Sequence, residues 1–186
     1  GKEAVLQSVN DLHIEAGVSA ALHGSIKSEQ EIIRNLIRHQ AAFYNIDELG
    51  LFLRKLNMSH KSGGASYLQG VIAMLMTAYS KASGNLMISG DAREDFKTDL
   101  VREYSMLNKR LEDGENAQIQ ARMDAITELL NNIDNGLPNP FLSMIGFSTP
   151  STFNESVSFE QITSGFIGRS IIINEPDTNP KRKRGF

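Results

Sequence analysis

Apolar residues recur at a helical spacing in several stretches of the chain, with short continuous apolar runs between them. Helices are predicted over residues 2–16, 29–40, 49–56, 66–81, 92–112 and 116–134, with shorter ones near 151–157 and 159–164. Strands are predicted over residues 41–46, 85–89, 141–145 and 170–174, whereas residues 18–24 are either a strand or a loop. Short apolar strands separated by helices are typical of an α/β fold with a mainly parallel sheet flanked by helices.

Local signals mark where these elements begin and end. Ser28, with Glu31 three residues later, is typical of a capping box and predicts the start of the second helix. The Gly-containing polar stretch 57–65 is predicted to be a loop. Gly114 divides the charged stretch 91–135 into two predicted helices. An Asn-Gly pair and two prolines mark the end of the second one. We expect this stretch to be a solvated helical insertion.

Composition excludes several kinds of chemistry. The 186 residues include no cysteine, which rules out a disulfide framework, a cysteine-based zinc site, an iron–sulfur cluster and a thiol nucleophile. The four histidines show no zinc-ligand spacing. No apolar run reaches the roughly 20 residues that a membrane-spanning helix needs, so no membrane partner is expected. The absence of cysteine is compatible with a reducing compartment.

The net charge of −3 conceals an asymmetry between the body of the chain and its end. Residues 181–184 are four consecutive basic residues, which leaves 15 basic against 22 acidic residues elsewhere, a charge of −7. A basic cluster of this kind contacts nucleic-acid phosphates, acts as a nuclear signal or is simply a solvated tail.

Two adjacent acids, Asp47 and Glu48, directly follow the predicted strand 41–46. The carboxyl ends of parallel strands face the ligand crevice of α/β folds. The first acid of such a pair can hold Mg²⁺ and the second can polarise an attacking water, as phosphoryl transfer requires. The alternative is a surface turn in which one of the acids caps the next helix.

Gly1 and Lys2 open the first predicted helix, and they match the end of the phosphate-binding motif GxxxxGK[ST]. In that motif the lysine reaches the phosphates at the helix N-terminus. Glu3 stands where a serine or threonine would ligate Mg²⁺. The alternative for Lys2 is an ordinary solvated side chain.

Two later segments add candidate phosphate contacts. Ser148 or Thr149, at the end of the strand 141–145, could sense a γ-phosphate or position a water, or could form only a turn and N-cap before Pro150. Arg169 lies in a glycine-containing segment and carries the group suited to bidentate phosphate contact. Its alternative is an ion pair at a strand edge.

The order of these four features is that of RecA-like and AAA+-like ATPases. Residues 23–53 and 139–173 further resemble the ATPase module of phage and mobile-element primase–helicase proteins. In that family a Walker B strand ends in Asp-Glu-(Leu/Phe/Ile)-Gly, followed later by a Gly-x-(Ser/Thr)-Thr-Pro turn and a Gly-Phe-x-x-Arg segment. The matching segments here are 47–50, 146–150 and 165–169. The resemblance is weakest across 91–135.

The resemblance implies a P-loop NTPase fold truncated at the P-loop. Residues 1–175 would be a partial ATPase core that includes the insertion 91–135, and residues 176–186 would be a basic C-terminal tail. The upstream strand and glycine loop of the family are absent, and we therefore expect the isolated chain to be inactive. Glu3 departs from the family pattern and would set a carboxylate against the phosphates.

The resemblance also implies ATP and Mg²⁺ as cofactors and assigns the site residues. Gly1 and Lys2 would bind phosphate, Asp47 would associate with Mg²⁺ and Glu48 would be the catalytic acid. Ser148 or Thr149 would be the sensor, and Arg169 a sensor or finger arginine that acts within or between subunits.

The implied function is the ATP-hydrolysing motor of a DNA replication helicase or primase–helicase. Such a protein would act on DNA as a homo-oligomeric ring in the cytoplasm of a bacterial host. The alternative function is a non-catalytic α/β scaffold that binds DNA or protein partners.

Overall fold

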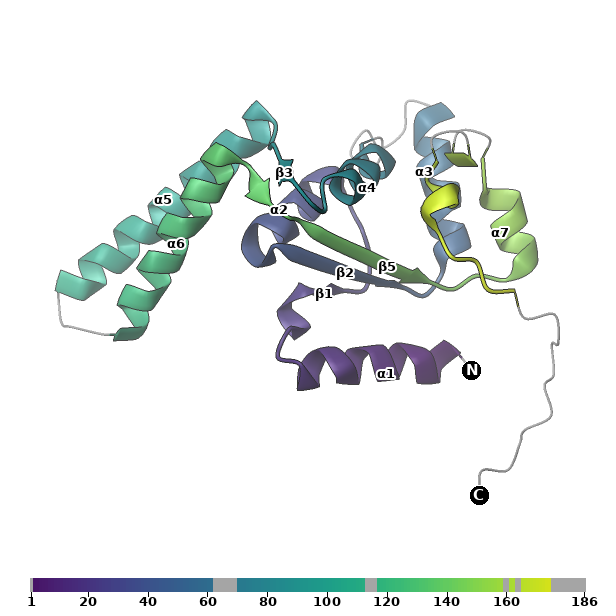
Figure 1. Cartoon of the computed structure of the whole chain (residues 1–186), viewed down its shortest axis with the longest axis horizontal. Coiled ribbons are helices and arrows are strands. Elements are labelled where there is room, and N and C mark those ends of the chain that lie inside the picture. The colour runs from purple at the N-terminus through teal and green to yellow at the C-terminus, as the bar shows by residue number, and fades with distance from the viewer. Residues whose placement is uncertain (1, 62–69, 113–116, 159–160, 163–164, 175–186) are drawn as a thin grey trace, which may run out of the picture.

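The computed structural model describes residues 2–61, 70–112, 117–158, 161–162 and 165–174 (Figure 1). Within them, a three-stranded sheet has the order β1–β2–β5, with both pairs parallel. Its strands are β1 (Leu22–His23), β2 (Ala41–Ile46) and β5 (Phe141–Gly146). The register pairs Ala41 with Phe141 and Ile46 with Gly146, so β2 and β5 end at the same level. The predicted α/β fold and its strands at 41–46 and 141–145 are confirmed.

The helices are distributed unequally over the sheet (Figure 1). One face carries α2 (Glu29–His39) and α4 (Val71–Ser80). The helices α3 (Leu49–Lys61) and α7 (Pro150–Ser156) lie together beyond the carboxyl ends of the strands. The opposite face carries α1 (Lys2–Glu15), which a short 3₁₀ turn, η1 (Ser19–Ala21), joins to β1.

A large part of the hydrophobic core lies between the sheet and the helices α2 and α4, and α3 adds Leu53 and Leu56 to it. The predicted apolar face of α2 supplies Ile32, Ile33, Leu36 and Ile37, which are all buried. Each such side chain contributes about 1.5–3 kcal/mol relative to an exposed one. Tyr44 of β2 is also buried there, and its hydroxyl accepts a hydrogen bond from Asn35 Nδ2 at 3.1 Å.

The predicted cap of α2 is confirmed in its main contact. Ser28 is the N-cap, and its Oγ accepts a hydrogen bond from the Glu31 backbone N–H at 3.1 Å. In a capping box the Glu31 carboxylate would accept from the N–H of the N-cap residue, Ser28. Here it accepts instead from the N–H of Lys27, one residue earlier, at 2.8 Å. The helix ends at Gln40, which adopts the left-handed conformation with a φ of 54°.

The charged stretch 91–135 forms a helical hairpin that projects from the sheet (Figure 1). Its helices are α5 (Gly90–Glu112) and α6 (Ala117–Asn135), as predicted. At its base, β3 (Asn85–Leu86) pairs antiparallel with β4 (Leu137–Pro138). The strand predicted over 85–89 is shorter than expected because its partner, β4, is also short. Asn139 follows β4 with a φ of 45°, which departs from strand geometry, and prolines have no N–H to donate to a ladder.

Two other predictions are wrong. The stretch 57–65 is not a loop from its start, because α3 continues to Lys61. Asn57 stabilises this continuation by donating to the Ser156 carbonyl at 2.6 Å and accepting from Gln161 at 3.1 Å. Residues 170–174 form no strand, and they pair with none of the described strands. None of the described helices combines the length and apolarity needed to cross a membrane.

Candidate functional site

The candidate site lies at the carboxyl edge of the sheet. Asp47 and Glu48 directly follow β2, and Ser148 follows β5 at the same level. Two backbone hydrogen bonds join the two segments: the Phe147 N–H donates to the Ile46 carbonyl at 3.0 Å, and the Leu49 N–H donates to the Phe147 carbonyl at 2.7 Å. The sheet therefore holds the acids and the hydroxyl side chain on one edge, as the sequence predicts.

Glycine is needed where these two segments touch. A Cβ atom on Gly146 would lie 2.8 Å from the Leu49 side chain, and one on Gly50 would lie 2.5 Å from Ser148 Oγ. Both distances are shorter than those of real Cβ contacts, so a larger residue would displace the side chains of Leu49, Ser148 or Thr152. The glycines of the two sequence motifs thus let the loop after β2 pack on the loop after β5.

Lys2, in the first turn of α1, contacts both acids. Its Nζ lies 2.8 Å from Asp47 Oδ1 and 3.5 Å from Glu48 Oε1. All three side chains remain about half exposed to solvent. The hydrogen bond from Lys2 to Asp47, together with the negative charges of both acids, raises the pKa of the lysine. The site is thus an open cluster of one protonated amine and two carboxyl groups at a helix N-terminus.

The rest of α1 is held to the sheet by few contacts. The His13 ring meets the edge of the Phe43 ring at a centroid distance of 4.5 Å. Asn45 Nδ2 donates to Asn10 Oδ1 at 3.4 Å. No residue of α1 is buried. The position of Lys2 therefore depends on a helix that lies on the sheet without entering the core.

Asn45 is a site residue that the sequence reasoning missed. It is buried on β2, and no partner for its Oδ1 atom lies among the described residues. It points to the same face of β2 as Phe43, because side chains alternate along a strand. The available signal was a lone amide in the otherwise largely apolar run 41–46.

The two predicted sensor residues have different roles. Thr149 is the N-cap of α7, since its Oγ1 accepts from the Thr152 N–H at 3.3 Å and donates to Thr152 Oγ1 at 2.8 Å. The alternative prediction of a turn and N-cap before Pro150 therefore holds for Thr149. Ser148 Oγ donates to the Thr149 carbonyl at 3.1 Å, and it lies against Gly50, three residues after Asp47. Ser148 is the better placed of the two to contact a ligand.

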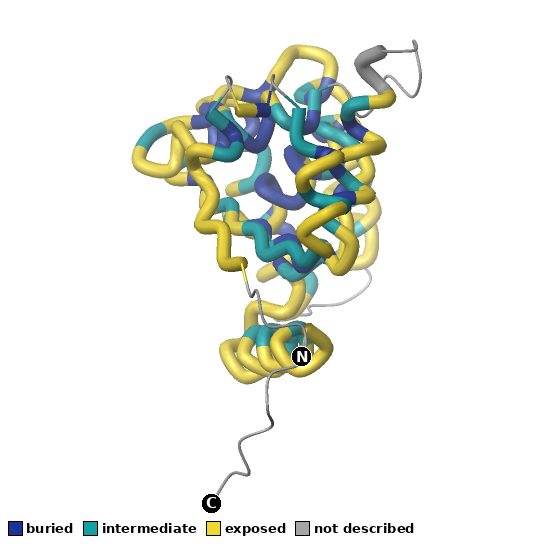
Figure 2. The backbone as a smooth tube through the Cα atoms, turned by 90° about the vertical axis from the view of Figure 1, so that its right-hand side faces the viewer, coloured by how far each residue is buried: buried dark blue, intermediate teal, exposed yellow. Residues whose placement is uncertain are grey.

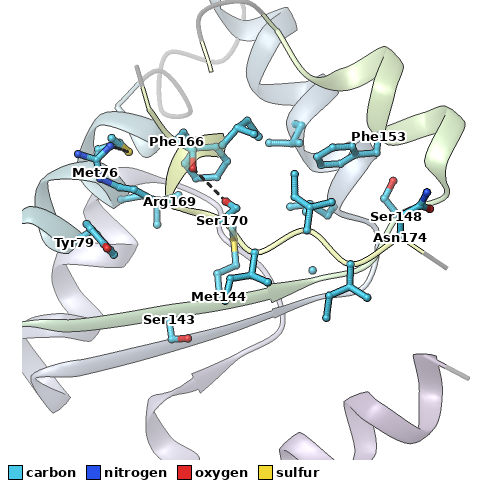
Figure 3. Close-up of a pocket in the computed structure, with 18 of the residues that line it drawn as sticks. Met76, Tyr79, Ser143, Met144, Ser148, Phe153, Phe166, Arg169, Ser170 and Asn174 are labelled. Carbon is cyan, nitrogen blue, oxygen red and sulfur yellow. Dashed lines mark hydrogen bonds between the residues drawn. The ribbon is translucent and has the colours of Figure 1, made fainter. Parts of the chain in front are cut away.

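Arg169 does not join the cluster. It ends the 3₁₀ turn η3 (Ile167–Arg169), and its Nη1 donates to the Gly165 carbonyl at 3.1 Å. Its guanidinium lies 5.4 Å from the centre of the Tyr79 ring. Figure 3 shows Arg169 and Ser148 at opposite ends of a pocket. The predicted pairing of Arg169 with a carboxylate at a strand edge is not present in the described residues.

The donor set fits a magnesium–phosphate ligand. Mg²⁺ is usually bound by one or two carboxylates together with substrate phosphates. Asp47 and Glu48 could provide the carboxylates. The described residues contain no group of three or more acidic or histidine side chains that could hold a metal alone. Lys2 and the backbone N–H groups at the start of α1 suit an anion. Gly1 and residues 175–186 lie outside the described residues.

No family model matches this sequence, and comparisons with curated proteins and with solved structures found no match.

Proposed function

We propose that the chain is the ATP-hydrolysing core of a DNA replication helicase or primase–helicase of a phage or mobile element, with a fold of the P-loop NTPase type. One observation carries the proposal: Lys2 contacts both Asp47 and Glu48 at the carboxyl edge of two parallel strands. These residues lie 45 or more positions apart in the sequence. Their meeting is therefore a product of the fold.

Each member of the cluster has a role that its charge supports. Lys2 and the N-terminal N–H groups of α1 bind the phosphates of ATP. Asp47 holds Mg²⁺, which neutralises phosphate charge when it is bound. Glu48 accepts a proton from the attacking water through its exposed carboxylate. Ser148 donates a hydrogen bond to the terminal phosphate or to that water.

Arg169 acts on the site of a neighbouring subunit in this proposal. Its distance from the acids within one chain, at the far end of the pocket, supports a role between subunits. An arginine that reaches into an adjoining subunit requires a homo-oligomer, in keeping with a ring on DNA. The basic residues 181–184 in the sequence suit contact with DNA phosphates.

The test uses the protein together with any residues that precede Gly1 in its natural sequence. We expect Glu48→Gln to lower DNA-stimulated ATP hydrolysis by about 100-fold or more while nucleotide binding persists. Glu128→Gln, at an exposed position of α6, is the matched control and should leave the rate unchanged. Equal rates for the wild type and Glu48→Gln would remove the catalytic role of Glu48.

A non-catalytic scaffold that binds DNA or protein partners is the second candidate. It is favoured by Lys2, which the two acids already neutralise, and by the carboxylate of Glu3 in the same helical turn. Failure of the protein used in that test to bind Mg²⁺-ATP at micromolar concentrations would support the scaffold and contradict the ATPase.

A further inference from the structure

The helix α5 carries apolar side chains on two sides. On the inner side, Phe96 and Leu100 are buried in the core. In its central part, Val101, Tyr104 and Met106 are 52%, 37% and 55% exposed. The other helix of the hairpin, α6, packs against α2 as well as against α5 (Figure 1). The two helices of the hairpin thus differ, because α5 keeps a partly apolar surface in water.

The charges of α5 separate along its length. Residues 91–99 contain four acidic and two basic side chains, whereas residues 102–110 contain one acidic and three basic ones. One charge in each half is already paired within the hairpin: Lys97 contacts an aspartate of α6, and Glu103 contacts an arginine of α6. The charges left over are four acidic and one basic in the first half, or −3, and three basic in the second half, or +3.

We infer that α5 binds the α5 helix of a second copy of this chain, in antiparallel orientation, with the two-fold axis close to Val101. The acidic half of each helix then lies beside the basic half of the other, so the charges of the two copies are complementary. Val101 and Tyr104 of one copy meet those of the other near the axis, because a two-fold contact uses the same surface twice. A parallel pair would place like charges together in both halves.

The position of the hairpin leaves room for the second copy. The hairpin projects from the sheet, and its base is the ribbon of β3 and β4 at the start of α5 (Figure 1). With 23 residues, α5 is about 35 Å long. An antiparallel pair therefore places the two sheets at opposite ends of the paired helices, where they do not collide.

This contact is independent of the proposed function. It uses none of the residues at the carboxyl edge of the sheet, so it does not require ATP hydrolysis. It also differs from the contacts of the proposed ring, since a ring is closed by head-to-tail contacts and this one is two-fold.

Sedimentation equilibrium of the 186-residue chain tests whether it self-associates in this way. We expect a monomer–dimer equilibrium. Its dissociation constant should rise by about tenfold or more when the salt concentration increases from about 0.05 M to about 0.5 M, because salt screens charges at a surface. A chain that stays monomeric up to about 1 mM would overturn the inference.

Charge reversal tests the pairing of the two halves. The double variant Lys109→Glu, Arg110→Glu gives both halves a negative balance, and Asp91→Lys, Asp95→Lys gives both a positive one. Each variant alone should dimerise about tenfold more weakly or worse, because like charges then face each other. An equal mixture of the two should recover the dimer. Circular dichroism checks that each variant keeps its helices, and a mixture that stays monomeric would contradict the inference.

The matched control makes the same change of charge outside the hairpin. Lys55→Glu, Lys81→Glu alters two exposed positions of the body and should leave the dissociation constant within about twofold. A dimer or a ring that forms equally well in this control and in both hairpin variants would use another surface. That outcome would refute the α5 contact, whether or not the protein hydrolyses ATP.

Cysteine cross-linking tests the orientation, because the chain has no cysteine of its own. Val101→Cys places one thiol of each copy near the axis, so an added oxidant should join the dimer through a disulfide. Asp91→Cys, near the start of the same helix, is the control. An antiparallel pair keeps these two thiols about 30 Å apart, too far for a disulfide. Equal cross-linking at both positions would indicate parallel helices and refute the inference.

Discussion

The two faces of the central sheet differ in almost every physical respect. On one face, Ala42, Tyr44 and Ile46 of β2 are buried against the helices. On the other, Phe141 is 50% exposed and α1 contributes no buried residue. Figure 2 shows the contrast, with dark blue gathered in the body and α1 almost entirely yellow and teal below it. One face supplies stability, and the other carries a helix that presents a charged residue to the site.

This contrast indicates how the candidate site is built. The acids directly follow β2, whose core-facing side chains are buried, whereas Lys2 is brought to them by a helix that has no buried residue. Local stability is expected to be lowest where apolar burial is least. We therefore expect α1 to open before the sheet unfolds.

The largest effect should come from a core leucine. Leu36→Ala removes a fully buried side chain of α2 and should lower the free energy of unfolding by about 3 kcal/mol. Leu12→Ala, at an exposed position of α1, is the matched control and should change it by less than about 0.5 kcal/mol. Urea denaturation measures both, and similar losses would show that α1 shares the core.

A smaller loss is expected at the hydrogen bond beneath α2. Tyr44→Phe leaves Asn35 Nδ2 buried without its acceptor and should cost about 1–2 kcal/mol. Burial also raises the pKa of Tyr44 from 10.0 to about 12. The unfolded chain loses this proton first, so the wild type should lose stability as the pH rises from 10 toward 12. Tyr44→Phe should lack that part of the alkaline loss.

His23 tests the same face at acidic pH. Its ring lies against Tyr44 at a centroid distance of 5.4 Å, and burial lowers its pKa. The folded state therefore prefers the neutral ring, and the unfolded state binds more protons below the ordinary pKa of 6.5. Stability should fall as the pH drops through this region. Denaturation of His23→Gln across the same pH range should show a shallower slope, although His39, whose pKa burial also lowers, retains part of it.

The smallest change in stability is expected at Lys2. Exposed ion pairs contribute between about 0 and 1 kcal/mol, so Lys2→Met should leave the free energy of unfolding nearly unchanged. The same variant should greatly weaken ATP binding by the protein used to test Glu48→Gln. A large loss of stability in the 186-residue chain would mean that α1 is fixed mainly through this contact, and the contrast between the faces would then be wrong.

Local patterns were sufficient for much of the fold. The strand before Asp47, the cap at Ser28 and the two helices α5 and α6 each follow from residues close in sequence. Residues 170–174 have strand composition but form no strand, since pairing needs a neighbour that local sequence does not specify. The placement of Arg169 beside Tyr79, and the buried amide of Asn45, likewise depend on contacts between distant segments.

The α5–α6 hairpin projects from the sheet and is attached to it at one end. Its base is the two-residue ribbon of β3 and β4, and Arg34 of α2 stacks over Phe96 near that base at 5.2 Å. Arg122 and Glu103 brace the two helices at 2.8 Å further along. With 23 residues, α5 extends for about 35 Å, so a rotation of about 5° at the base displaces its far end by about 3 Å. A partner bound at the outer end of the hairpin would therefore move by several ångströms when the hairpin rotates slightly at its base.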